Sequence, residues 1–166
     1  DLVFFPYSVL PLLIGRSRSV TALEEAGLDR DLVLLVTQRD SAIDDPGSGD
    51  LFRIGTIARI VQITALPDGT SRVVLEGLGR ARILRLTTKT KALRATVELL
   101  TDREVESDGE VPETALSLTQ TVANLYAEYA QLHERIPEEL SGILSAEGDR
   151  VRFIHLVAGH LILPAL

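Results

Sequence analysis

The clearest pattern of hydrophobic and polar positions is a pair of long β-favouring runs, residues 54–66 and 70–86. In the second run, Val73 and Leu75 alternate with charged residues, and this period of two is typical of a half-buried strand. The runs are joined by Pro67-Asp68-Gly69, and each of these three residue types favours a tight turn for its own reason. We therefore expect an antiparallel hairpin.

Two glycines interrupt the return run of this hairpin. The tripeptide Gly77-Leu78-Gly79 predicts a bulge or a sharp bend, because glycine inside a strand weakens regular pairing and allows close backbone approach. A bend at this point lets one long strand serve two sheet edges, as a small closed barrel requires.

Shorter elements are expected around the hairpin. Residues 17–26 predict a short helix with Gly27 as its stop. The apolar run 31–37 predicts a buried strand. Glycine, proline and aspartate make residues 44–50 a loop, and residues 93–100 favour one further strand. The first hundred residues are therefore expected to be rich in β-structure.

From Pro112 onward, apolar residues recur at helical spacing. One helix is expected from Pro112 to Leu132, with the proline in its first turn. A second, short helix is expected after Pro137, and a third after Asp149, whose side chain suits an N-cap. The third helix is apolar nearly all round, so we expect it to be buried on more than one side.

These patterns predict an α+β chain with a β-rich lobe over residues 1–100, a linker over 101–111 and a small helical lobe over 112–166. The length of 166 residues is sufficient for a hydrophobic core without covalent cross-links. The chain has no cysteine, which excludes a disulfide framework and thiolate metal sites. It also has no methionine, which suggests a processed product or an excised fragment.

The composition is apolar for a chain of this charge, with 45% hydrophobic residues and a formal net charge of −7. We expect an oligomer contact or a missing covalent neighbour to cover part of that apolar surface. Pro6 and Pro11 interrupt the apolar stretch over residues 2–14, and no run reaches the length that a membrane span needs. The chain is expected to be soluble, to have no membrane partner and, by default, to be cytoplasmic.

Recognisable catalytic chemistry is missing from the sequence. There is no GxxxxGK[ST] phosphate loop, and the only lysines, Lys89 and Lys91, lie in a polar connecting segment, which argues against a Ser–Lys pair. His155 and His160 are too far apart around a helix to share a metal ion. The adjacent acids Glu138-Glu139 fit the positive end of a helix better than an acid–base pair. We expect no enzymatic activity, no metal and no cofactor in this chain.

The segment over residues 3–12 is an apolar ribbon that holds three of the seven aromatic residues. Its two prolines restrict the backbone, and each favours an extended conformation for the residue before it. Such a ribbon is either a strand that closes the core or an exposed docking surface for apolar peptide. Both interpretations can hold together, because alternate side chains of a strand face opposite ways.

Charge is unevenly distributed along the chain. Between Arg72 and Arg94 there are seven basic residues and one acidic residue, whereas from Glu98 to Asp149 there are thirteen acidic residues and two basic ones. This asymmetry is typical of a nucleic-acid-binding face, or of a strand whose arginines face solvent. No aromatic residue lies among the arginines to stack on bases, which favours the second interpretation.

Several stretches, taken in order, resemble the N-terminal domain of Lon, the ATP-dependent protease. Residues 3–16, VFFPYSVLPLLIGR, are similar to the opening pattern VVFPxxxxPLxxGR of that family. The ordered similarity continues over residues 34–40, 44–46, 50–60, 66–70, 74–83, 136–139 and 160–161. It is the ordered set, rather than any single motif, that carries the resemblance.

The resemblance implies a PUA-like β-rich pseudo-barrel followed by a helical lobe. In the family, this unit does no chemistry, helps to recognise unfolded or damaged protein substrates and supports assembly of a hexameric ring. ATP and Mg²⁺ are used by a downstream ATPase domain, and a Ser–Lys protease domain cuts the substrate. The family usually has a short strand before the position of Asp1, and we expect it to be missing here; residues 87–110 match the family poorly.

We therefore expect a non-catalytic domain that binds unfolded or damaged proteins, and other copies of itself, through apolar surface. The candidate substrate contacts are Pro6, Tyr7, Val9, Leu10 and Phe52. Two alternatives remain open. One is a stand-alone PUA-like module that binds RNA phosphates through arginines of the hairpin, Arg72, Arg80, Arg82 and Arg85. The other is an adaptor protein that carries a Lon-type domain without any protease.

Overall fold

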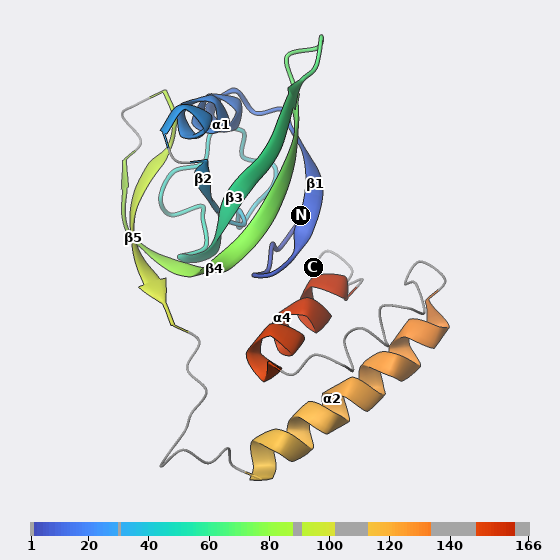
Figure 1. The fold of residues 1–166 in the computed structure, drawn as a ribbon. Helices are drawn as coiled ribbons and strands as arrows, with labels where there is room; N and C mark the ends of the chain where they lie inside the picture. Colours follow the sequence, from blue (N-terminus) through green and yellow to red (C-terminus); the bar gives the residue numbers. More distant parts are fainter. Residues whose placement is uncertain (1, 30, 88–90, 102–112, 134–148, 162–166) are drawn as a thin grey trace. The chain divides into compact units, whose positions relative to one another are not determined.

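The computed structural model describes residues 2–29, 31–87, 91–101, 113–133 and 149–161. The chain divides into two compact units, Asp1–Thr101 and Asp102–Pro164. Among the described residues, the first unit has five strands and one helix, and the second has two helices (Figure 1). Each unit is considered by itself below.

The predicted hairpin is confirmed. It consists of β3 (Ile54–Ala65) and β4 (Ser71–Thr87), which pair antiparallel along most of their length. In the turn, Gly69 has a positive φ of 83°. The Asp68 carboxylate accepts hydrogen bonds from the backbone N–H of Thr70 at 3.0 Å and from its hydroxyl at 2.7 Å. Both hydrogen bonds favour the charged carboxylate and therefore lower the pKa of Asp68, and the bond from the Thr70 hydroxyl makes the larger contribution.

The predicted bulge is also confirmed, and it divides β4 into two halves that pair with different strands. Ile57 pairs with Gly79 and Ala58 pairs with Gly77, so Leu78 is the extra residue. The first half of β4 pairs with β1 (Val9–Ile14) and the second half pairs with β5 (Arg94–Leu100). One long strand therefore contributes to both sides of a strongly bent sheet (Figure 1).

The remaining elements of the first unit differ from expectation in their limits. Helix α1 spans Ser17–Asp29 and continues past Gly27. Asp31, with φ of 55°, donates its N–H to the Ala26 carbonyl at 3.0 Å and closes the helix end. Aspartate tolerates this left-handed conformation better than most residues, so glycine was not needed there. Strand β2 is only Leu32–Leu35, it pairs with β3, and it is partly rather than fully buried.

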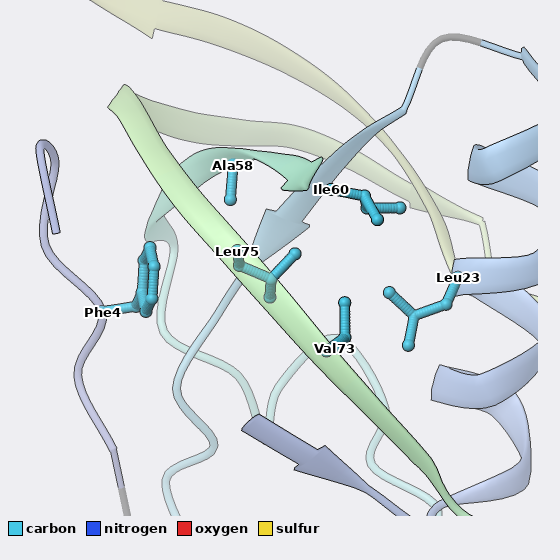
Figure 2. Packing of buried hydrophobic residues seen from close by; sticks show 6 residues of the cluster. All are labelled: Phe4, Leu23, Ala58, Ile60, Val73 and Leu75. Carbon is cyan, nitrogen blue, oxygen red and sulfur yellow. The ribbon is translucent and has the colours of Figure 1, made fainter. Parts of the chain in front are cut away.

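The core of the first unit joins residues from distant parts of the sequence. Figure 2 shows Val73 and Leu75 of β4 between Phe4 of the N-terminal segment and Leu23 of α1. Val73 and Leu75 are fully buried. Truncating a leucine in such a site typically costs about 2–5 kcal/mol, so this cluster makes a large contribution to holding the N-terminal segment and α1 on the sheet.

The second unit contains α2 (Glu113–Leu132) and α4 (Arg150–His160). Both agree with the sequence pattern, and Asp149 is the predicted N-cap, because its side chain accepts a hydrogen bond from the Arg152 N–H at 3.1 Å. Tyr126 of α2 packs with Phe153 and Val157 of α4 in a small core. The linker expected over 101–111 and the helix expected after Pro137 fall largely outside the described residues.

Candidate functional site

The N-terminal segment is held against the rest of the first unit by side-chain and backbone hydrogen bonds. The Thr37 hydroxyl donates to the Leu2 carbonyl at 3.0 Å, and the buried Thr56 hydroxyl donates to the Phe4 carbonyl at 2.5 Å. Beyond a corner at Tyr7, where φ is 65°, the Tyr7 N–H donates to the Gly77 carbonyl at 2.8 Å. The segment is thus held in an extended course before it enters β1.

Strand β1 has two chemically similar faces in different environments. Leu10, Leu12 and Ile14 pack against the core. Val9, Pro11 and Leu13 face outward, and the side chains of Val9 and Leu13 are 57% and 65% exposed. We name these three outward residues the β1 face. Three adjacent apolar side chains on the solvent side of a strand are unusual on a free protein surface, where apolar residues are more often scattered singly.

Within the described residues, β1 has β4 as its only strand neighbour. The Gly77 N–H donates to the Ser8 carbonyl at 2.9 Å, so in the alternating antiparallel pattern the peptide groups of Leu10 and Leu12 bond to β4. Those of Val9 and Leu13 point to the other edge. Pro11 also lies at an outward position, where its missing N–H costs no ladder bond. The β1 face therefore adjoins a row of available backbone groups.

The structure separates the five residues predicted to contact substrate. Pro6 is among the most deeply buried side chains, and Leu10 points toward the core. Tyr7 and Val9 are exposed at the start of β1. Phe52 is 44% exposed, and the Arg39 guanidinium lies 4.5 Å from the centre of its ring. Only Val9 of the five belongs to the β1 face.

Sequence reasoning missed Pro11 and Leu13, although the signal that identifies them was available. A period of two applied along residues 9–14 places Val9, Pro11 and Leu13 on one side. The predicted site included both Val9 and Leu10, which are adjacent in the strand and therefore lie on opposite sides of it. The choice of which side faces solvent still required the pairing of Leu10 with Leu75 in the core.

A second apolar feature of the same unit is a cavity of about 1860 Å³. Its walls include all of β2 and all of β5 except Glu98, and α1 contributes Leu23 and Ala26. Across its rim, Arg94 of β5 forms an ion pair with Glu25 of α1 at 2.6 Å, and Arg18 pairs with Asp45. We name this cavity the β2–β5 slot.

The arginines considered for RNA binding do not form a uniform basic surface. Arg82 makes an ion pair with Glu98 of β5 at 2.8 Å. Arg72 lies opposite Leu13, in the row next to the β1 face, and Arg80 contributes to the lining of the β2–β5 slot. The RNA-binding alternative stays a prediction from the charge pattern.

Two further observations concern metals and membranes. In the described part of the chain, no three His, Asp or Glu side chains are grouped closely enough to hold a metal ion. Neither does any helix in those ranges have the length and apolar character that crossing a membrane requires.

The fold defined here is an α+β fold with an antiparallel, strongly bent sheet and separate helices, as expected from the sequence. It is similar to the solved N-terminal domain of the Mycobacterium avium complex Lon protease. The TM-score is 0.62 at 17% sequence identity, and the match covers 97% of this chain and 95% of that one.

Sequence comparison then defines the family. Residues 1–165 match the family of the ATP-dependent protease La (LON) substrate-binding domain. The chain is 39% identical over 163 residues to the Lon protease of Erwinia amylovora and 37% identical over 163 residues to that of Escherichia coli K12. Each match covers 97% of this chain and 20% of the relative. The chain belongs to the Lon substrate-binding domain family, and it spans about a fifth of the length of these relatives.

Proposed function

We propose that this chain is the non-catalytic substrate-binding part of a Lon-type ATP-dependent protease and that it captures unfolded or damaged proteins on the β1 face. The observation that carries the proposal is the exposed apolar row Val9, Pro11 and Leu13 on a strand that has one strand neighbour among the described residues. Membership of a substrate-binding family supports a polypeptide ligand.

The physical basis is the difference between folded and unfolded substrates. An unfolded chain exposes apolar side chains that a native protein buries, and covering one leucine or valine is worth about 1.5–3 kcal/mol at most. Three such side chains give weak, reversible binding once the cost of association is subtracted. Several copies acting together would raise the avidity without any new contact. Weak single sites suit a domain that must release its substrate.

The proposal extends to the larger protein. ATP and Mg²⁺ would be used by a separate ATPase domain, and peptide-bond cleavage by a separate serine protease domain. Other copies of this chain would be partners in a hexamer, and the protein would act in the cytoplasm. These statements are supported by the family to which the chain belongs and by the Lon proteases to which it is similar.

Replacing Val9 and Leu13 with serine tests the β1 face. Both side chains are more than half exposed, so the double variant should fold normally but bind a fluorescently labelled, permanently unfolded casein at least about tenfold more weakly by anisotropy. The matched control is Leu132→Ser in α2, where the leucine is 82% exposed. Casein affinity that is unchanged in the double variant, or reduced equally in the control, would contradict the proposal.

A further inference from the structure

The β2–β5 slot is bounded by two strands that each have one sheet neighbour in the described residues. Strand β2 pairs with β3, and β5 pairs with β4. All four residues of β2 and six of the seven residues of β5 line the slot; Glu98 is the exception. Each strand therefore has one edge that is not paired with another strand of the described residues. The N–H and C=O groups along such an edge can pair with another extended chain.

The size of the slot favours a chain over a small molecule. At about 1860 Å³, it is larger than the roughly 300–1,000 Å³ of typical small-ligand pockets. An extended strand rises about 3.3 Å per residue, so a peptide of seven or eight residues has the length of β5. The apolar lining includes Val33, Leu35 and Val97, which suits a strand with apolar side chains on at least one face.

Two pairs of oppositely charged side chains in the lining of the slot are matched within the chain. Arg94 is paired with Glu25 and Arg18 with Asp45. Arg16 donates to the Gln38 side chain and to the Ser41 carbonyl, the latter at 3.0 Å. A charged ligand would have to displace these partners, whereas an uncharged one leaves them in place. Charge complementarity therefore favours a neutral occupant.

We propose that the β2–β5 slot binds an extended, uncharged and mainly apolar polypeptide strand, which adds to the free edge of β5 by main-chain hydrogen bonds. This is the β-strand addition mode, in which backbone bonds give affinity and alternate side chains give selectivity. The inference rests on the proposed function in one respect, namely that the ligand is polypeptide. It adds a second site, with a different binding mode from that of the β1 face.

The test uses an eight-residue peptide of alternating valine and threonine with blocked ends, and a second peptide with the same side chains but N-methylated amides. The first should slow hydrogen exchange of the amides of Arg94–Leu100 and Leu32–Leu35, and the second should not, because it lacks the N–H donors. Leu99 is 71% exposed and lines the slot. Leu99→Lys should weaken binding of the first peptide at least about tenfold. The control Leu132→Lys on α2, where the leucine is 82% exposed, should leave the affinity unchanged.

The other results separate the two proposals. Protection confined to Val9–Ile14, equal binding of the N-methylated peptide or unchanged affinity of Leu99→Lys would overturn strand addition in the slot. So would the lack of any peptide binding. If casein still binds the β1 face in that case, the proposed function stands without the slot. If casein also fails to bind, both proposals fall.

Discussion

The two units of this chain are stabilised by different kinds of contact. In the first, the core joins Phe4, Leu23 and Val73, which are far apart in sequence, and backbone segments approach one another closely. In the second, the described contacts lie between two helices that each follow from local spacing. Helix α2 also leaves Leu118, Leu125 and Leu132 exposed. Stability in the first unit therefore depends on long-range fit, and stability in the second on local helix signals.

The largest effect is expected where backbone meets backbone in the first unit. A Cβ added at Gly77 would lie 2.5 Å from the Phe5 carbonyl oxygen and 3.1 Å from the Pro6 Cα. Because neither backbone atom can move cheaply, Gly77→Ala should destabilise the first unit by about 3 kcal/mol. Hydrogen exchange followed by mass spectrometry should show faster exchange in β1 and β4 and unchanged exchange in α2.

Gly79 provides the matched control, because it lies two residues away across the same bulge. No heavy atom of a non-neighbouring residue lies within 4 Å of a Cβ built at Gly79. Gly79→Ala should change the stability by less than about 1 kcal/mol. An equal loss in both variants, or faster exchange in α2 of the Gly77 variant, would remove the contrast between the two units.

A smaller effect is expected at the start of α4, where a local signal should be decisive. The Asp149 side chain accepts a hydrogen bond from the Arg152 N–H, and α4 has only 11 residues. Asp149→Ala should cost about 1 kcal/mol. This corresponds to roughly fivefold faster exchange of the α4 amides, since 1.4 kcal/mol is a factor of ten.

Asp149→Asn separates the cap from other consequences of the substitution. Asparagine keeps an oxygen acceptor at the same place and is an equally good N-cap. Its α4 amides should therefore exchange nearly as in the unmodified chain. Exchange in β3 and β4 should be the same in both variants. Faster exchange there would mean that α4 stabilises more than its own unit.

The difference between local signals and long-range contacts also explains which features could be predicted from the sequence. The hairpin turn at Pro67-Asp68-Gly69, the bulge at Leu78 and the cap at Asp149 are local, and each was identified from residues that are adjacent in the chain. The predicted end of α1 at Gly27 was wrong, because the residue with positive φ that closes the helix is Asp31 and not a glycine. Local signals define elements well when only one residue type fits the position.

The candidate site depended on information that is not local. Pro6 was expected at the surface but is buried, and Leu10 points toward the core where it pairs with Leu75. Composition alone marks residues 3–12 as apolar without saying which side faces solvent. The β2–β5 slot is formed by strands separated by about sixty residues, and neither strand alone carries a signal for it. Sites built by topology require the pairing as well as the pattern.

The smallest change in stability is expected in the core of the second unit, on removal of one hydroxyl group. Tyr126 is 4% exposed, and its hydroxyl has no hydrogen-bond partner among the described residues. Burial, with a smaller contribution from Tyr129, raises the pKa of Tyr126 above its ordinary value of 10.0. Above pH 10 the unfolded state therefore loses this proton while the folded state keeps it, so the stability falls as the pH rises. At neutral pH both states are protonated.

Tyr126→Phe removes both the unsatisfied hydroxyl and this alkaline loss. At pH 7 the variant should be as stable as the unmodified chain, or more stable by less than about 1 kcal/mol. Above pH 10 its advantage should grow, as measured by urea unfolding followed by circular dichroism. Tyr7→Phe, at an exposed position of the first unit, should retain the alkaline loss. If Tyr126→Phe is clearly less stable at pH 7, its hydroxyl has a partner, and the core of the second unit is more specifically organised than two locally defined helices require.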